Sequence, residues 1–371
     1  MNFENFELVF VRLGPRKNHY LNGNIDRLRN LFPELQITVI LDSQSQQLNV
    51  PVKGVKYWLY ANQNNQNLLH GNVRKSNSFR DGFWTLTTER LFAVLEYQSS
   101  NPNLSILHIE SDVLLFPNFP FAKLKSLNQI SWSSFNETKD VASIFFLPSV
   151  SENSWLKKEL QEEIRFDTDV TDMTALSIIS QRNPNKVCIL PPFGSVSAHL
   201  LVNHRNHNAK FRLDRLIHLE EHFSGIFDPA AIGMWLCGLD PENFHGKLLL
   251  HDRSFIDNGD SFIDPSALDF QIDSEGNLFF LCGSSWIPIY NLHVHSKNRK
   301  LLSNAWLGEL RKYVNMARKR EPQSKKNLGT YWSVLARQGT TYELLHYLGR
   351  HPQVYPLAIK IKNLATKIVK R

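Results

Sequence analysis

The sequence predicts an α/β protein built on a mixed, mainly parallel β-sheet flanked by helices. Its first 41 residues carry much of this prediction. Glu7–Leu13 is a strand-like apolar run, Asn24–Leu31 has apolar residues at helical spacing, and Ile37–Leu41 is a second apolar run. Strand, helix and strand at this spacing form a βαβ unit, which places its two strands in parallel.

A second helix and strand follow before residue 120. Thr85–Tyr97 has the spacing of an amphipathic helix and is followed by Ser-Ser-Asn-Pro, which ends a helix. The run Leu104–Ile109 is apolar and rich in branched side chains, as is typical of a strand buried on both faces. Further strands are predicted over 129–132 and 143–147, and further helices over 155–164 and 173–180.

Length and charge predict two parts of the chain. The 371 residues are 42% hydrophobic, which is enough for a large core, and no apolar stretch approaches the ~20 residues that span a bilayer. Residues 296–371 hold 17 Lys and Arg against 3 Asp and Glu, whereas the whole chain holds 42 and 35. We therefore expect an α/β domain over 1–300 and a basic helical extension over 301–371.

The end of this extension has the pattern of an interfacial helix. Leu357–Arg371 places apolar residues on one face, and lysines and an arginine flank or oppose that face. Such a helix binds an anionic membrane surface, where each basic residue contributes about 1 kcal/mol. The alternative is that its apolar face packs on the domain. No nucleic-acid partner is expected, because the body of the chain lacks interleaved basic and aromatic residues.

Cysteine usage and the N-terminus bear on the compartment. Cys188, Cys237 and Cys282 are odd in number and widely separated, which favours a reducing compartment over a disulfide framework. The N-terminal residues have no basic region followed by an apolar core, as a signal peptide would. The expected location is the cytoplasm, at the inner face of the membrane if the basic helix meets lipid.

An acidic motif follows the predicted strand Leu104–Ile109. Glu110 and Asp112, separated by Ser111, stand directly at the end of this strand. Buried carboxylates are costly unless a cation or ligand neutralises them, and strand ends are where open α/β sheets bind ligands. The motif predicts a hard-metal site that holds a diphosphate. The alternative is a solvated turn after a core strand.

Two later stretches carry candidate partners. Ile289–His295 is strand-like, so His293 and His295 project to the same face, and Lys297 follows them. Asp172 follows Thr171 at the start of a predicted helix, and Asp228 precedes Pro229 in another short helical segment. These two acids are candidates for acid–base chemistry, or they cap helices.

The order of these motifs resembles that of metal-dependent nucleotide-sugar glycosyltransferases of the GT-A fold, including bacterial and viral members. The resemblance rests on Thr88–Phe92, on Leu107–Leu114 with Glu-Ser-Asp in place of Asp-x-Asp, and on Phe227–Pro241 and Asn291–Lys297. In that superfamily an arginine-bearing helix precedes a buried strand that ends in Asp-x-Asp. The resemblance implies a GT-A-like sheet over residues 1–300.

The resemblance also implies roles for individual residues. Asp112 would be the metal ligand, with His295 and then His293 completing the site, and Glu110 would contact metal or ribose beside Ser111. Arg90 and Lys297 would meet the donor diphosphate, and Asp172 or Asp228 would be the base of an inverting enzyme. The nucleotide base would face Val11, Leu13 and Asp42. The expected ion is Mn²⁺ or Mg²⁺.

The function expected from these roles is transfer of a sugar, such as a hexose, from a nucleoside diphosphate-sugar to a glycan or lipid-linked acceptor, as in polysaccharide biosynthesis. A sugar-nucleotide nucleotidyltransferase is one alternative. It requires a glycine-rich phosphate-binding turn after the first strand, and Leu13–Lys17 is not one. A non-enzymatic module that binds an anionic surface through the basic tail is the other.

Overall fold

The computed structural model describes residues 3–16, 18–61, 82–136, 138–149, 154–166, 170–193, 222–238, 261–262, 265 and 268–318. All of them belong to one compact unit, Met1–Arg320. The predicted interfacial helix Leu357–Arg371 lies outside the described residues. Among the helices that are described, none is both long and apolar enough to cross a membrane.

Seven strands form the central sheet, in the order β3-β2-β1-β4-β7-β6-β8. Their bounds are β1 Phe6–Arg12, β2 Gln36–Leu41, β3 Lys56–Leu59, β4 Ser105–Ile109, β6 Ile130–Asn136, β7 Lys139–Leu147 and β8 Val187–Leu190. Strands β3, β2, β1 and β4 are mutually parallel, β7 is antiparallel to β4 and β6, and β8 is parallel to β6. The predicted mixed, mainly parallel sheet is confirmed.

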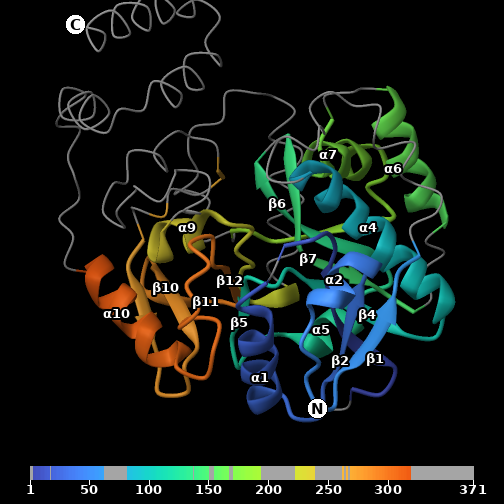
Figure 1. The fold of residues 1–371 in the computed structure, drawn as a ribbon. Coiled ribbons are helices and arrows are strands. Elements are labelled where there is room, and N and C mark those ends of the chain that lie inside the picture. Colours follow the sequence, from blue (N-terminus) through green and yellow to red (C-terminus); the bar gives the residue numbers. More distant parts are fainter. Residues whose placement is uncertain are drawn as a thin grey trace, which may run out of the picture. The chain divides into compact units, whose positions relative to one another are not determined.

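Helices cover both faces of this sheet (Figure 1). Their bounds are α1 Leu21–Leu31, α2 Ser43–Leu48, α4 Phe83–Ser100, α5 Phe121–Lys125, α6 Ser154–Phe166 and α7 Asp172–Arg182. Helices α1 and α5 pack on the face that carries Phe10, whereas α4, α6 and α7 pack on the face that carries Val9. Side chains alternate between the faces of a strand, so β1 contributes to both cores.

A second group of elements lies beside the sheet. Its members are β5 Val113–Leu115, α9 Ala231–Cys237, β9 Phe270–Ile272, β10 Leu278–Cys282, β11 Ser285–Ile289, β12 Asn291–His293 and α10 Trp306–Arg318. Strands β9, β10 and β11 form one antiparallel sheet, and β5 pairs with β12 in another. Helix α10, which begins after residue 300, buries Trp306, Leu310 and Tyr313 and contacts α9 and β9.

The order of elements expected from the resemblance is present. Helix α4 carries Arg90, β4 follows it as a fully buried strand, and Glu110 comes directly after β4. One difference concerns the strand predicted over Ile289–His295. The chain leaves one sheet with β11 at Ile289 and joins the other with β12 at Asn291, so regular pairing ends at His293.

Candidate functional site

The acidic turn, Glu110, Ser111 and Asp112, connects β4 to β5 at the carboxyl edge of the parallel strands. The Glu110 amide donates to the Ser143 carbonyl at 3.0 Å, and the Val113 amide donates to the Glu110 carbonyl at 3.0 Å. The turn is therefore a continuation of two ordered strands, and Asp112 is buried within it.

Helix α1 fixes this turn from the other side. The Asn24 side chain donates to the carbonyls of Ser111 at 3.1 Å and Val113 at 2.9 Å, and Arg27 donates to the Leu115 carbonyl at 2.9 Å. Both side chains are buried, and burial lowers the pKa of Arg27 to about 9. Sequence reasoning missed this clamp, because two polar residues in an amphipathic helix give no signal that they face the core.

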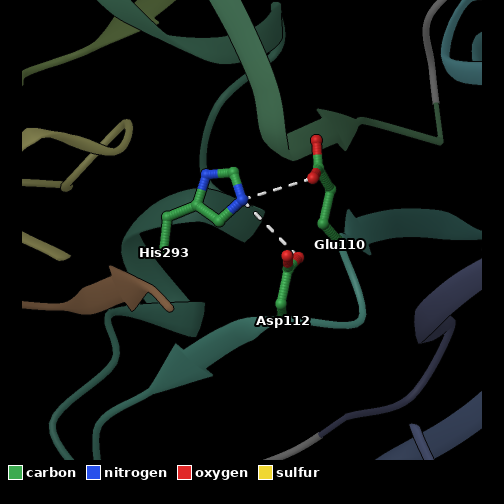
Figure 2. A group of neighbouring side chains, drawn as sticks. All are labelled: Glu110, Asp112 and His293. Atoms are coloured by element: carbon green, nitrogen blue, oxygen red, sulfur yellow. Dashed lines mark ion pairs between the residues drawn. The ribbon is translucent and has the colours of Figure 1, made fainter. Parts of the chain in front are cut away.

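Pairing between β5 and β12 brings His293 to the acidic turn. His293 lies opposite Val113 in the register, and the Val294 amide donates to the Asp112 carbonyl at 2.8 Å. Its Nε2 atom lies 3.4 Å from Glu110 Oε2 and 3.5 Å from Asp112 Oδ1. Dashed lines in Figure 2 mark these two ion pairs. Ligand atoms of these three residues lie within 4.8 Å of one another, which is a geometry that can hold a metal ion.

The far side of the His293 ring is fixed by the loop before α9. Nδ1 lies 3.0 Å from the Pro229 carbonyl oxygen. The buried Asp228 carboxylate accepts hydrogen bonds from the amides of Ile232, Gly233 and His293, at 2.9, 2.8 and 3.2 Å. The Asn291 side chain holds this loop in turn, because it donates to the Asp228 carbonyl and accepts from the Asp228 amide.

Charge is tightly balanced around the three ligands. Burial favours the neutral forms, but mutual attraction outweighs burial. Arg90 and His293 hold the pKa of Glu110 well below its usual value. His293 likewise holds the pKa of Asp112 below the usual value of an aspartate. The two carboxylates raise the pKa of His293 well above its usual value. A protonated His293 and Arg90 together therefore balance the two carboxylate charges of the acidic turn.

The donor set fits a divalent cation. Two carboxylates and one imidazole are ligands that Mn²⁺ accepts readily, and Mg²⁺ less readily because of the nitrogen. A neutral His293 that donates from Nδ1 to Pro229 directs its Nε2 lone pair at the carboxylates, the outer-shell arrangement usual for metal-bound histidines. The structure thus brings together Glu110, Asp112 and His293.

Arg90 and Asp172 lie at the border of this cluster. Arg90 Nη1 is 2.8 Å from Glu110 Oε1, and Arg90 Nη2 is 3.8 Å from Asp172 Oδ2. Thr171 caps α7 through a reciprocal bond pair with Thr174, so Asp172 stands in the first turn with its side chain buried. The predicted capping role therefore belongs to Thr171, and Asp172 faces the arginine.

His295 and Lys297 lie just beyond the cluster. The rings of His293 and His295 are 4.6 Å apart, and the His295 amide donates to the His293 carbonyl in a tight turn. His295 is not among the three residues whose side chains could hold a metal ion together. Lys297 has a φ of 52° and lies near enough to Asp112 to lower the pKa of that acid, although burial acts on it more strongly in the opposite direction.

The residues expected to face a nucleotide base lie at the ends of β1 and β2. Val11 and Leu13 are half-buried and pack against the α4 side of the core. The Asp42 carboxylate caps α2 through the Ser45 amide at 2.7 Å and accepts from the Gly14 amide at 2.8 Å. Ser111 accepts from the Asn18 side chain at 2.8 Å. Asp42 therefore has a structural use for both of its oxygens.

Comparison with known proteins finds no matching family model and no matching curated protein. Among solved structures, the galactosyltransferase LgtC in complex with donor and acceptor sugar analogs matches with 10% identity and a TM-score of 0.38, over 85% of this chain and 98% of that one. A glycosyltransferase involved in glycosylation of the major capsid of PBCV-1 has 12% identity and a TM-score of 0.32, over 58% and 98%. Mouse xyloside xylosyltransferase 1 has 10% sequence identity and a TM-score of 0.30, over 51% of this chain and 86% of that one. Likeness at this level carries no argument about function.

Proposed function

We propose that this protein is a glycosyltransferase that moves a sugar from a nucleoside diphosphate-sugar to a glycan or lipid-linked acceptor. The observation that carries the proposal is the convergence of Glu110, Asp112 and His293, from distant parts of the sequence, at the carboxyl edge of the sheet. These residues would hold Mn²⁺ or Mg²⁺. Arg90 and Lys297, one beside Glu110 and the other near Asp112, add positive charge.

The chemistry of sugar transfer explains this combination. The bond from the anomeric carbon to the donor diphosphate breaks as negative charge accumulates on the leaving group. A bound divalent cation supplies Lewis-acid stabilisation of that charge. Arg90 and Lys297 add fixed positive charge at the same place, and such preorganised electrostatics is usually the largest contribution to catalysis.

The two candidate bases have different surroundings. Asp228 is fully buried, and its carboxylate accepts hydrogen bonds from three backbone amides. Burial raises its pKa to about 6. We assign it the role of a positioning residue that holds His293. Asp172 lies beside Arg90 at the border of the cluster, so it is the base for an acceptor hydroxyl if the reaction inverts the anomeric configuration.

A turnover assay tests the proposed reaction. Purified protein with Mn²⁺ should release nucleoside diphosphate from one member of a panel of sugar nucleotides, and an Asp112→Asn variant should lose this release. A nucleotidyltransferase would instead form sugar nucleotide from a nucleoside triphosphate and a sugar phosphate. If the protein formed sugar nucleotide from a nucleoside triphosphate and a sugar phosphate, and released no nucleoside diphosphate from any sugar nucleotide, the proposal would be overturned.

The basic C-terminal segment supplies a second, separate part of the proposal. The apolar face and the lysines of Leu357–Arg371 support peripheral binding to anionic lipid, which would bring the enzyme to a lipid-linked acceptor. Full-length protein should float with anionic vesicles at low salt, and protein that ends at residue 356 should not. Equal flotation of both would remove the membrane role and leave the transferase proposal intact.

A further inference from the structure

Glu89 is a buried acid that the proposed reaction does not use. It lies on α4 immediately before Arg90 and is only 6% exposed. Its Oε1 atom is buried without a hydrogen-bond partner in the described part of the chain. Because nearly all buried polar atoms in native proteins are paired, such a carboxyl group calls for a functional explanation.

The position of Glu89 connects it to the ends of β1 and β2. Leu86, one turn earlier on α4, lies against the loop after β1, since its Cδ1 is 2.8 Å from where a Cβ on Gly14 would be. The charge of Asp42, at the end of β2, also acts on Glu89. Glu89 thus lies near the end of β1, where Val11 and Leu13 stand. The next residue on α4, Arg90, contacts Glu110 in the acidic turn.

Asp42 and Glu89 differ in the oxygens that they can offer a ligand. Both carboxylate oxygens of Asp42 accept hydrogen bonds from backbone amides, one from Ser45 and one from Gly14. Among the described residues, no hydrogen bond to a backbone amide is formed by Oε1 of Glu89, which is buried without a partner there. Glu89 is therefore the better acceptor at this edge, although the resemblance implied Asp42.

We propose that Glu89 recognises the base of the nucleoside diphosphate donor by accepting hydrogen bonds from its N–H groups. This inference rests on the proposed function and names the residue that selects the nucleotide. An ionised carboxylate only accepts hydrogen bonds, so it favours a base edge with adjacent donors. Because the pKa of Glu89 is raised to about 7, binding is measured at pH 8, where the group is ionised. Guanine offers N1–H beside N2–H₂, whereas uracil has one N–H between two carbonyls, and adenine and cytosine set an acceptor nitrogen beside the amino group. Guanine is the expected base.

Binding of four nucleoside diphosphates tests the assignment. The dissociation constants of GDP, UDP, CDP and ADP are measured with Mn²⁺ for the wild type, for Glu89→Gln and for Glu96→Gln. Glu96 is a half-buried carboxyl on the same helix and serves as the matched control. The wild type and Glu96→Gln should prefer GDP. Glu89→Gln should lose about 10- to 100-fold in GDP affinity, the range for one hydrogen bond to a charged group, and should bind the four nucleotides with similar affinity.

Three results would overturn this inference, and they are distinguishable from failure of the proposed function. If Glu89→Gln binds all four nucleotides with wild-type affinity, Glu89 does not recognise the base. Metal-dependent binding in the same experiment would still support the transferase proposal. A wild-type preference for UDP that Glu89→Gln leaves unchanged would do the same. With 2′-deoxy-GDP added to the panel, a Glu89→Gln variant that weakens binding of all four ribonucleotides equally and no longer distinguishes GDP from 2′-deoxy-GDP would assign Glu89 to the ribose. Absence of any metal-dependent nucleotide binding by the wild type would end both proposals.

Discussion

His293 Nδ1 lies 3.0 Å from the Pro229 carbonyl oxygen, while Nε2 of the same ring faces Glu110 and Asp112 at 3.4 and 3.5 Å. The ring is held from both sides, by a backbone acceptor and by two carboxylates. Metal-bound histidines usually donate their second ring nitrogen to an outer-shell acceptor, which fixes tautomer and orientation. His293 has the same arrangement, with Nδ1 at a backbone carbonyl and Nε2 toward the two carboxylates.

The first prediction separates the two histidines. His293→Ala removes a ligand and should reduce Mn²⁺ affinity by more than the about 10- to 100-fold that loss of an outer-shell partner costs. His295→Ala should leave Mn²⁺ affinity nearly unchanged, because His295 is outside the group of three ligand residues. Titration of Mn²⁺ followed by electron paramagnetic resonance measures both. The reverse order of effects would return the ligand role to His295.

The second prediction concerns Asp228. Asp228→Asn replaces one accepting oxygen with an amide nitrogen, which cannot accept, so either the bond from Ile232 or the bonds from Gly233 and His293 are lost. Because Asp228 positions His293, this substitution should reduce Mn²⁺ affinity by about 10- to 100-fold. The exposed Asp26→Asn on α1 is the control. If Asp228→Asn lowered kcat while metal affinity stayed at the wild-type value, Asp228 would be a base instead.

The third prediction uses two glycines in helices. A Cβ on Gly233 would lie 2.0 Å from the His293 carbonyl oxygen, whereas a Cβ on Gly308 in α10 would meet nothing within 4 Å. Gly233→Ala should reduce the free energy of unfolding by about 1–3 kcal/mol or more, as overpacking does. Gly308→Ala should increase it by up to about 1 kcal/mol, since alanine is the better helix former. Urea unfolding measures both, and a neutral Gly233→Ala would contradict the close packing of α9 on β12.

The fourth prediction is a pH dependence of stability from Glu89. Burial, with the Asp42 charge second, raises the pKa of Glu89 to about 7 in the folded protein. The folded state then holds a proton that the unfolded chain loses above its lower pKa, near 4.5. Stability should therefore fall as pH rises between these values, by on the order of 3 kcal/mol from this group. Unfolding of the wild type and Glu89→Gln from pH 4 to 8 isolates the contribution, and identical pH profiles would contradict it.

Much of the central sheet could be predicted from sequence because its strands are strongly apolar. The runs that became β1, β2 and β4 are continuous apolar segments of strand length, and the segment that became α4 is long and ends at Ser-Ser-Asn-Pro. The short strands β9 and β10 were not predicted. Strands of three to five residues, paired with neighbours that no local pattern reveals, give little signal.

The site was predictable at its acidic turn and less so around it. Two carboxylates at the end of a buried strand are visible in sequence, and the structure places both near an imidazole. The choice between His293 and His295 depends on where β12 ends, and periodicity alone does not fix that residue. The bonds from Asp228 to three backbone amides and the clamp from Asn24 exist only in the folded chain.

The most direct test of the central claim is calorimetric titration of a nucleoside diphosphate with and without Mn²⁺. The wild type should bind at least one nucleoside diphosphate, and binding should depend on Mn²⁺. Asp112→Ala and His293→Ala, shown to be folded by circular dichroism, should lose the metal-dependent part. Nucleotide binding of equal strength without metal and in both variants would contradict the assignment of Glu110, Asp112 and His293 as the metal site of a sugar transferase.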